Sequence, residues 1–145
     1  MIGAHPSEVV RVVCALFSPF VAVYGAYIIV HGHYGPGGGF AGGVFVAMGA
    51  ILPRLTLDED IAYRIVPPVV GPLLGGLGML LFLVVAAAPL LVGGSFLDYG
   101  AFEFATVEAN RVRYQGILVV EIAVGLAVAG ALLLIFDVLT GRSQR

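Results

Sequence analysis

The sequence predicts an all-α integral membrane protein with four transmembrane helices and with both termini in the cytoplasm. Hydrophobic residues make up 60% of the 145-residue chain and charged residues only 11%, whereas soluble domains carry about 25% charged residues. A soluble fold of this length cannot bury so much apolar surface, because roughly a third of the unfolded chain's surface stays in water. The composition therefore excludes a cytosolic enzyme, a nucleic-acid-binding protein and a secreted module.

Four apolar segments are long enough to cross a bilayer, which requires about 20 mostly apolar residues in a helix. They cover about residues 12–30, 40–57, 66–92 and 116–138. The second is the weakest of the four, because it carries Pro53 and Arg54 near its far end. The length of the chain fits a single membrane domain over residues 1–145.

The arginines that flank the spans predict their orientation. Five of the seven basic residues lie beside span ends on one side of the membrane, namely Arg11, Arg54, Arg64, Arg142 and Arg145. Only Arg111 and Arg113 lie on the other side. Because cytoplasmic loops carry an excess of basic residues, we expect both termini in the cytoplasm and residues 31–39 and 93–115 outside.

The most distinctive segment is the turn between the first two spans, His31-Gly-His-Tyr-Gly-Pro-Gly-Gly-Gly-Phe-Ala-Gly-Gly43. Its glycines and its proline cannot continue one helix, so it predicts a tight turn and a glycine-rich start of the second span. We expect this structural motif to be formed by Pro36, Gly37, Gly38, Gly39, Phe40, Gly42 and Gly43. Small residues recur every four positions at Gly39, Gly43 and Ala47, which favours close approach of another backbone. The free amides of such a helix start could also hold an anion.

The two histidines of this turn, His31 and His33, are candidates for proton relay, because an unperturbed imidazole titrates near ~6.5. The alternative is a polar cap at the membrane surface. They lie two residues apart, do not share a helical face, and have no neighbouring carboxylate or thiolate to complete a metal or haem site. We therefore expect no bound metal and no cofactor.

Glu121 is the acidic residue that the sequence singles out. It lies inside the fourth span, roughly 8–10 Å below the predicted start at ~1.5 Å per residue. An ionisable group at such a depth costs on the order of 2–3 kcal/mol and normally faces protein or water. Gly125 and Ala129 follow at intervals of four residues, so we expect the carboxylate on a helix-packing stripe. Two roles stay open, an ion-carrying group and an interhelical hydrogen bond for assembly.

Two other charges lie near the ends of spans. Arg54 follows Pro53 near the cytoplasmic end of the second span, and we expect its side chain to extend to the interface. Asp137 lies close to the last turn of the fourth span, and we expect it to reach water. The sequence shows no Ser-His-Asp or Cys-His set, so no hydrolytic active site is indicated.

The turn resembles the signature of the B subunit of Mrp-type multisubunit cation/proton antiporters (the MnhB/MrpB family). That signature is written approximately as His/Arg-Gly-His-x-x-Pro-Gly-Gly-Gly-Phe-x-Gly-Gly. Residues 93–100, Gly-Gly-Ser-Phe-Leu-Asp-Tyr-Gly, look like the family's loop before the last helix. Residues 121–128, Glu-Ile-Ala-Val-Gly-Leu-Ala-Val, look like its Glu-x-Gly-Val-type helix start, with Ala123 in place of the expected glycine.

The resemblance implies a small four-helix subunit, not an enzyme, of a complex that exchanges Na⁺ (or Li⁺, K⁺) for H⁺ across a prokaryotic plasma membrane. The implied partners are the lipid bilayer and the other subunits of an Mrp-type complex, including large antiporter-like subunits, and no nucleic acid. By the same resemblance, related membrane-bound hydrogenases use homologues of this small subunit. Glu121 and the turn at residues 31–43 are the positions that the resemblance marks as important.

Three hypotheses follow. In the first, Glu121, His31 and His33 line or border the ion path of a cation/proton antiporter. In the second, the chain is a purely structural assembly subunit of such a complex or of a related membrane-bound hydrogenase, without a transport residue of its own. The third is a stand-alone four-helix exporter that works as a dimer. The absence of an acidic residue within the first span argues against the exporter, whose type keeps an essential Glu there.

Overall fold

The computed structural model describes residues 7–32, 34, 37–101 and 109–141, and every regular element in these ranges is helical. The α-helices and the two short 3₁₀ helices are, in chain order, α1 (Glu8–His31), α2 (Gly39–Thr56), α3 (Glu59–Ile65), α4 (Val70–Ala87), η1 (Ala88–Val92), η2 (Tyr99–Ala101) and α5 (Ala109–Leu139).

Four helical stretches of the described chain are long and apolar enough to cross a membrane, namely Glu8–His31, Gly39–Thr56, Glu59–Val92 and Arg111–Leu139. This result confirms the prediction of an all-α chain with four spanning helices. The first stretch begins earlier than predicted, because Ser7 caps α1 and its Oγ accepts a hydrogen bond from the amide of Val10.

The third span differs most from its prediction. The sequence predicted a span from residue 66, but the chain forms the short helix α3 before it, and the long helix of the span begins only at Val70. Pro67 and Pro68 cause the break, since proline has no amide hydrogen and disfavours a helical conformation in the residue before it. Pro72 is tolerated because it lies in the first turn of α4.

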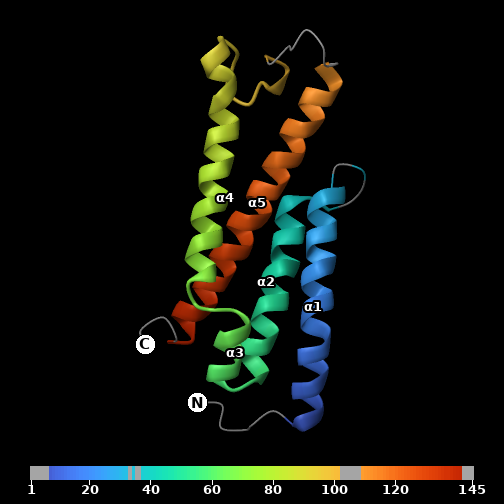
Figure 1. Ribbon diagram of the computed structural model, residues 1–145, viewed down its shortest axis with the longest axis vertical. Coiled ribbons are helices and arrows are strands. Elements are labelled where there is room, and N and C mark those ends of the chain that lie inside the picture. Colours follow the sequence, from blue (N-terminus) through green and yellow to red (C-terminus); the bar gives the residue numbers. More distant parts are fainter. Residues whose placement is uncertain (1–6, 33, 35–36, 102–108, 142–145) are drawn as a thin grey trace.

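The helices form two antiparallel pairs, α1 with α2 and α4 with α5, and α2 joins the pairs by packing against α5 (Figure 1). The helices α2 and α5 run parallel (Figure 1). The first described residues of α1 and the last of α5 lie at the same end of the molecule, where α3 also lies (Figure 1). The pairs are staggered, so that the end of α1 and the start of α2 lie beside the middle of α5 (Figure 1).

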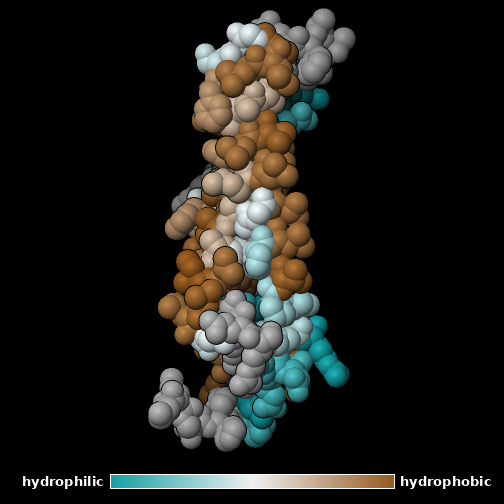
Figure 2. All heavy atoms as spheres, turned by 90° about the vertical axis from the view of Figure 1, so that its left-hand side faces the viewer, coloured by the Kyte–Doolittle hydropathy of each residue, from teal (hydrophilic) through white to brown (hydrophobic). Residues whose placement is uncertain are grey.

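Apolar side chains cover the outside of the bundle. The face shown in Figure 2 is hydrophobic over most of its height, and hydrophilic residues gather at the end that holds α3. Large apolar side chains such as Phe20 on α1 and Leu80 on α4 are more than half exposed, at 65% and 60%. Such a surface suits contact with lipid hydrocarbon or with neighbouring membrane helices.

Glycines allow α2 to pack closely on two sides. Towards α1, a Cβ added at Gly49 would lie 2.8 Å from the Cβ of Ala22. Towards α5, a Cβ added at Gly43 would lie 2.6 Å from the main-chain oxygen of Gly125. Real side chains do not tolerate such distances, so the positions of both neighbouring helices depend on glycine in α2.

Candidate functional site

The carboxylate of Glu121 lies against the glycine-rich turn that joins α1 to α2. A Cβ added at Gly32 would be 3.0 Å from Oε1 of Glu121, and one added at Gly38 would be 3.5 Å from the same atom. The other carboxylate oxygen, Oε2, is buried. The two features that the sequence singled out separately are therefore in direct contact.

Backbone geometry explains why this part of the turn is glycine. Gly38 precedes the first residue of α2 with φ of +105°, a conformation that residues with a side chain rarely adopt. At the next position, Gly39, an added Cβ would collide with the main-chain oxygen of Glu121. A side chain at either position would move the turn or α2 away from Glu121.

The contact continues along α2 and α5 as two facing stripes of small residues. Gly43 of α2 packs on Gly125 of α5, one helical turn beyond the contact of Gly39 with Glu121. Gly125 is buried and also faces Ile29 of α1, and Ala129 is only 1% exposed. The structure thus places Gly125 and Ala129 on the same buried face of α5 as Glu121.

The helix that carries Glu121 begins before the predicted apolar span. Glu121 is twelve residues beyond Ala109, the first residue of α5, which corresponds to about 18 Å along the axis, whereas the predicted 8–10 Å was counted from the start of the apolar span. The helix begins earlier because Arg113 and Gln115 are good helix formers despite their polarity. The carboxylate is consequently near the middle of α5 while it lies at the end of the α1–α2 pair.

The other candidates from the turn are placed differently. His31 ends α1, is exposed, and stacks on Tyr27 of the same helix with 4.1 Å between ring centres. Its Nδ1 lies 3.3 Å from the main-chain oxygen of Tyr27. Phe40 faces outward and is 68% exposed. His33 and Pro36 lie outside the described residues.

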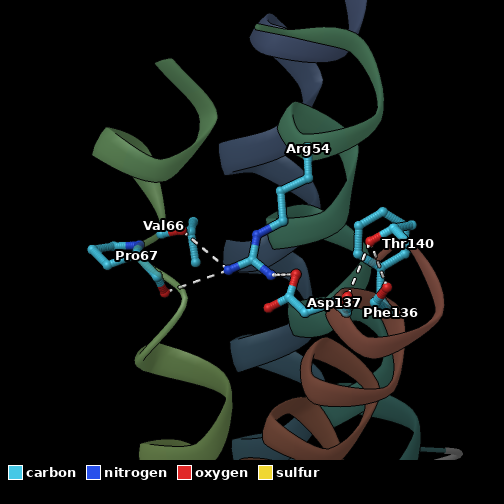
Figure 3. A network of polar contacts seen from close by, with 6 residues as sticks. All are labelled: Arg54, Val66, Pro67, Phe136, Asp137 and Thr140. Carbon is cyan, nitrogen blue, oxygen red and sulfur yellow. Dashed lines mark hydrogen bonds and ion pairs between the residues drawn. The ribbon is translucent and has the colours of Figure 1, made fainter. Parts of the chain in front are cut away.

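Arg54 and Asp137 form a buried ion pair, so the expectations that Arg54 extends to the interface and that Asp137 reaches water are wrong. Arg54 is 0% exposed and Asp137 is 3% exposed. Nη1 of Arg54 donates to Oδ1 of Asp137 (Figure 3). The pair therefore joins the end of α2 to the end of α5.

The same guanidinium also holds the break in the third span. Nη2 of Arg54 donates to the main-chain oxygens of Val66 at 3.1 Å and Pro67 at 3.4 Å (Figure 3). The ring centre of Tyr63 lies 5.8 Å from Cζ, within the range of a cation–π contact. Thr140 closes the end of α5 by donating to the main-chain oxygens of Phe136 and Asp137.

A signal for this pair exists in the sequence, although each residue taken alone does not reveal it. Arg54 and Asp137 have opposite charges, and both lie near span ends predicted on the same side of the membrane. A buried charge is stable only when it is paired and hydrogen-bonded. Two opposite charges at matching depth in two apolar helices are therefore candidates for a pair.

Comparison with known proteins identifies the family of the chain. Residues 9–134 match the model of a domain related to the MnhB subunit of Na⁺/H⁺ antiporter. The Na⁺/H⁺ antiporter B subunit of Bacillus subtilis is 26% identical over 115 residues, which are 79% of this chain and 80% of the relative. A putative antiporter subunit mnhB2 of Staphylococcus aureus is 25% identical over 134 residues, 92% of this chain and 94% of the relative. The chain therefore belongs to the family of domains related to the MnhB subunit of Na⁺/H⁺ antiporters.

Proposed function

We propose that the chain is a small membrane subunit of a multisubunit monovalent cation/proton antiporter in the plasma membrane of a prokaryote. Na⁺ and H⁺ are the transported ions, and other antiporter subunits, including large antiporter-like ones, are the partners. Glu121 borders the ion route. The observation that supports a role for Glu121 is the contact of its carboxylate with the glycine turn.

The position of the turn supports this role. An ionisable side chain inside a membrane span is costly and is kept mainly where it pairs or serves transport. Irregular backbone at membrane depth is tolerated only where it is buried in protein or lines a water-filled cavity. Here both unusual features occur together, because the non-helical residue Gly38 lies next to Glu121 of α5.

A purely structural role is the competing function, and close packing around Gly39 and Gly125 is the observation that favours it. The two roles differ in what they require of Glu121. Assembly requires the shape and the hydrogen-bonding atoms of the side chain, which glutamine retains. Ion transfer requires the ionisable carboxylate, which glutamine lacks.

The test is Glu121→Gln, assayed for Na⁺/H⁺ exchange in membrane vesicles and for recovery of the complex after mild detergent extraction. We expect exchange to fall at least about tenfold, the range of a lost transport step of 1.4 kcal/mol or more, while the other subunits still copurify. Glu8→Gln is the matched control, because Glu8 is an exposed residue at the start of α1. It should leave both measurements unchanged.

Three outcomes would change the assignment. Unaltered exchange in Glu121→Gln would show that the carboxylate does not act in transport. Loss of exchange together with loss of assembly would favour the structural role. The third outcome is that the wild-type chain purifies as a homodimer that alone restores ion or drug tolerance. That result would contradict the assignment to a multisubunit antiporter and favour a stand-alone exporter.

A further inference from the structure

The surroundings of Arg54 have the composition of a cation site. Its guanidinium contacts three oxygen atoms, a carboxylate oxygen of Asp137 and the main-chain oxygens of Val66 and Pro67 (Figure 3). The ring of Tyr63 also lies near the guanidinium, with 5.8 Å between Cζ and the ring centre. These groups come from α5, from the α3–α4 connection and from α3, so the cation lies where three segments meet.

The two main-chain oxygens are available because the helix is broken at this point. Residues 66–69 lie between α3 and α4, and Pro67 and Pro68 have no amide hydrogen to donate. The amide of Val70 donates to the main-chain oxygen of Pro67 at 3.0 Å, so the guanidinium is a second donor to that oxygen. The break therefore presents two carbonyl oxygens that a donor or a cation from elsewhere in the bundle can reach, as Arg54 does.

Free cations commonly fill this type of site. In transporters with discontinuous membrane helices, the carbonyls of the unwound segment coordinate Na⁺, often together with acidic side chains. The oxygen set around Arg54 is of that type, with one carboxylate and two carbonyls of an interrupted span. The difference is that the positive charge here is attached to α2 by its own side chain.

We propose that Arg54 is the resident cation of a monovalent-cation site, which its guanidinium keeps filled and closed to free ions. Without this side chain the site takes a free monovalent cation of suitable size. In the native protein the α3–α4 connection is thus fixed to α5 whatever the concentration of sodium ions. This inference does not depend on the role proposed for Glu121.

The test is Arg54→Ala in the full-length chain, purified with the assembly that it copurifies with, in a thermal unfolding experiment. The probes are low concentrations of guanidinium, Na⁺ and K⁺, with choline as a control for ionic strength. We expect the variant to unfold at a lower temperature than wild type and to be stabilised saturably by at least one probe. At ten times its Kd, a bound ion raises the ratio of folded to unfolded protein about tenfold. Wild type should show no such response.

Two controls isolate the site. Arg64→Ala removes an exposed arginine from α3 and should produce no cation response. Arg54→Ala combined with Asp137→Asn keeps the main-chain oxygens and one side-chain oxygen but removes the negative charge, so the response should be lost. If Arg54→Ala does not accumulate, Arg54→Gln replaces it and should show the same response.

The proposal fails if neither Arg54 variant responds to guanidinium, Na⁺ or K⁺ more than to choline. It also fails if wild type responds as strongly as the variant. Absence of both variants from cell membranes would likewise overturn it, since cytoplasmic K⁺ would then have been unable to fill the vacated site. None of these outcomes depends on the exchange activity of Glu121→Gln, so the two proposals can fail separately.

Discussion

Two acidic residues of α5, Glu121 and Asp137, lie sixteen residues apart, about 24 Å along the helix axis. Asp137 is paired with the fully buried Arg54. Glu121 instead lies against the main chain of glycines at a turn. One helix thus keeps two carboxylates inside an apolar bundle by two different means.

The difference shows that charge stabilises one end of the interface between α2 and α5, whereas close backbone packing stabilises the other end. At the Asp137 end an opposite charge fixes the neighbouring segments, and the partner side chain is long and specific. At the Glu121 end the absence of side chains lets the backbone come close, and the carboxylate stays in contact with a non-helical turn. The ion pair at Asp137 fixes the segments around it, whereas the glycine contact at Glu121 leaves a carboxylate beside non-helical backbone.

The largest expected difference is between two variants that each replace a carboxylate of α5 by an amide, Asp137→Asn and Glu121→Gln. Asp137→Asn leaves the buried Arg54 without its negative partner, and breaking a buried ion pair in this way costs about 3–5 kcal/mol. Glu121→Gln retains shape and hydrogen-bonding atoms, so we expect about 1 kcal/mol or less. The measurement is the unfolding midpoint of the two purified variants. Equal destabilisation would mean that the two ends do not differ as described.

An intermediate effect is expected from Gly43→Ala, which lies between the two ends. Its Cβ would press on the main chain of Gly125, and overpacking of this kind costs about 1–3 kcal/mol. Gly76→Ala is the matched control, because a Cβ at Gly76 of α4 meets no described atom within 4 Å. That control should be neutral or stabilising by up to about 1 kcal/mol, since alanine is the better helix former. Unfolding of the two variants by heat in detergent checks the difference.

The smallest effect is expected from Ser18→Ala, at the contact of α1 with α2. Oγ of Ser18 donates to the main-chain oxygen of Gly49 at 2.6 Å in a buried position. Hydrogen bonds between membrane helices contribute about 0.6 kcal/mol on average, so the unfolding midpoint should fall slightly and exchange should persist. Ser95→Ala, at an exposed site outside the helices, should cause no change. A loss as large as that of Asp137→Asn would show that uncharged contacts of α1 matter as much as the ion pair.

Hydropathy and glycine spacing predicted much of this arrangement. The four spans follow from apolar length, and the stripe through Gly39 and Gly43 follows from spacing in one helix. Both properties are local, because each depends on residues only a few positions apart. The contact of that stripe with α5 was open in the sequence, since nothing in it says which backbone approaches.

Partners that are distant in the chain were harder to predict. Arg54 and Asp137 are 83 residues apart, and each alone looks like an ordinary charge near a helix end. Their pairing depends on the parallel packing of α2 on α5, a tertiary property. The start of α5 at Ala109 was also missed. Its first turns contain charged side chains, and a search for apolar segments does not detect a helix that begins with polar residues.

The stagger of the two helical pairs has a consequence for the thickness of the surrounding bilayer. The α1–α2 pair ends at the level of Glu121, while α5 continues for about 18 Å beyond it. A flat hydrocarbon layer of about 30 Å cannot match both pairs at once. Each ångström of mismatch costs a fraction of a kcal/mol in lipid deformation. A neighbouring protein that covers the step would relieve this deformation, so lipid elasticity itself would favour association of the subunit.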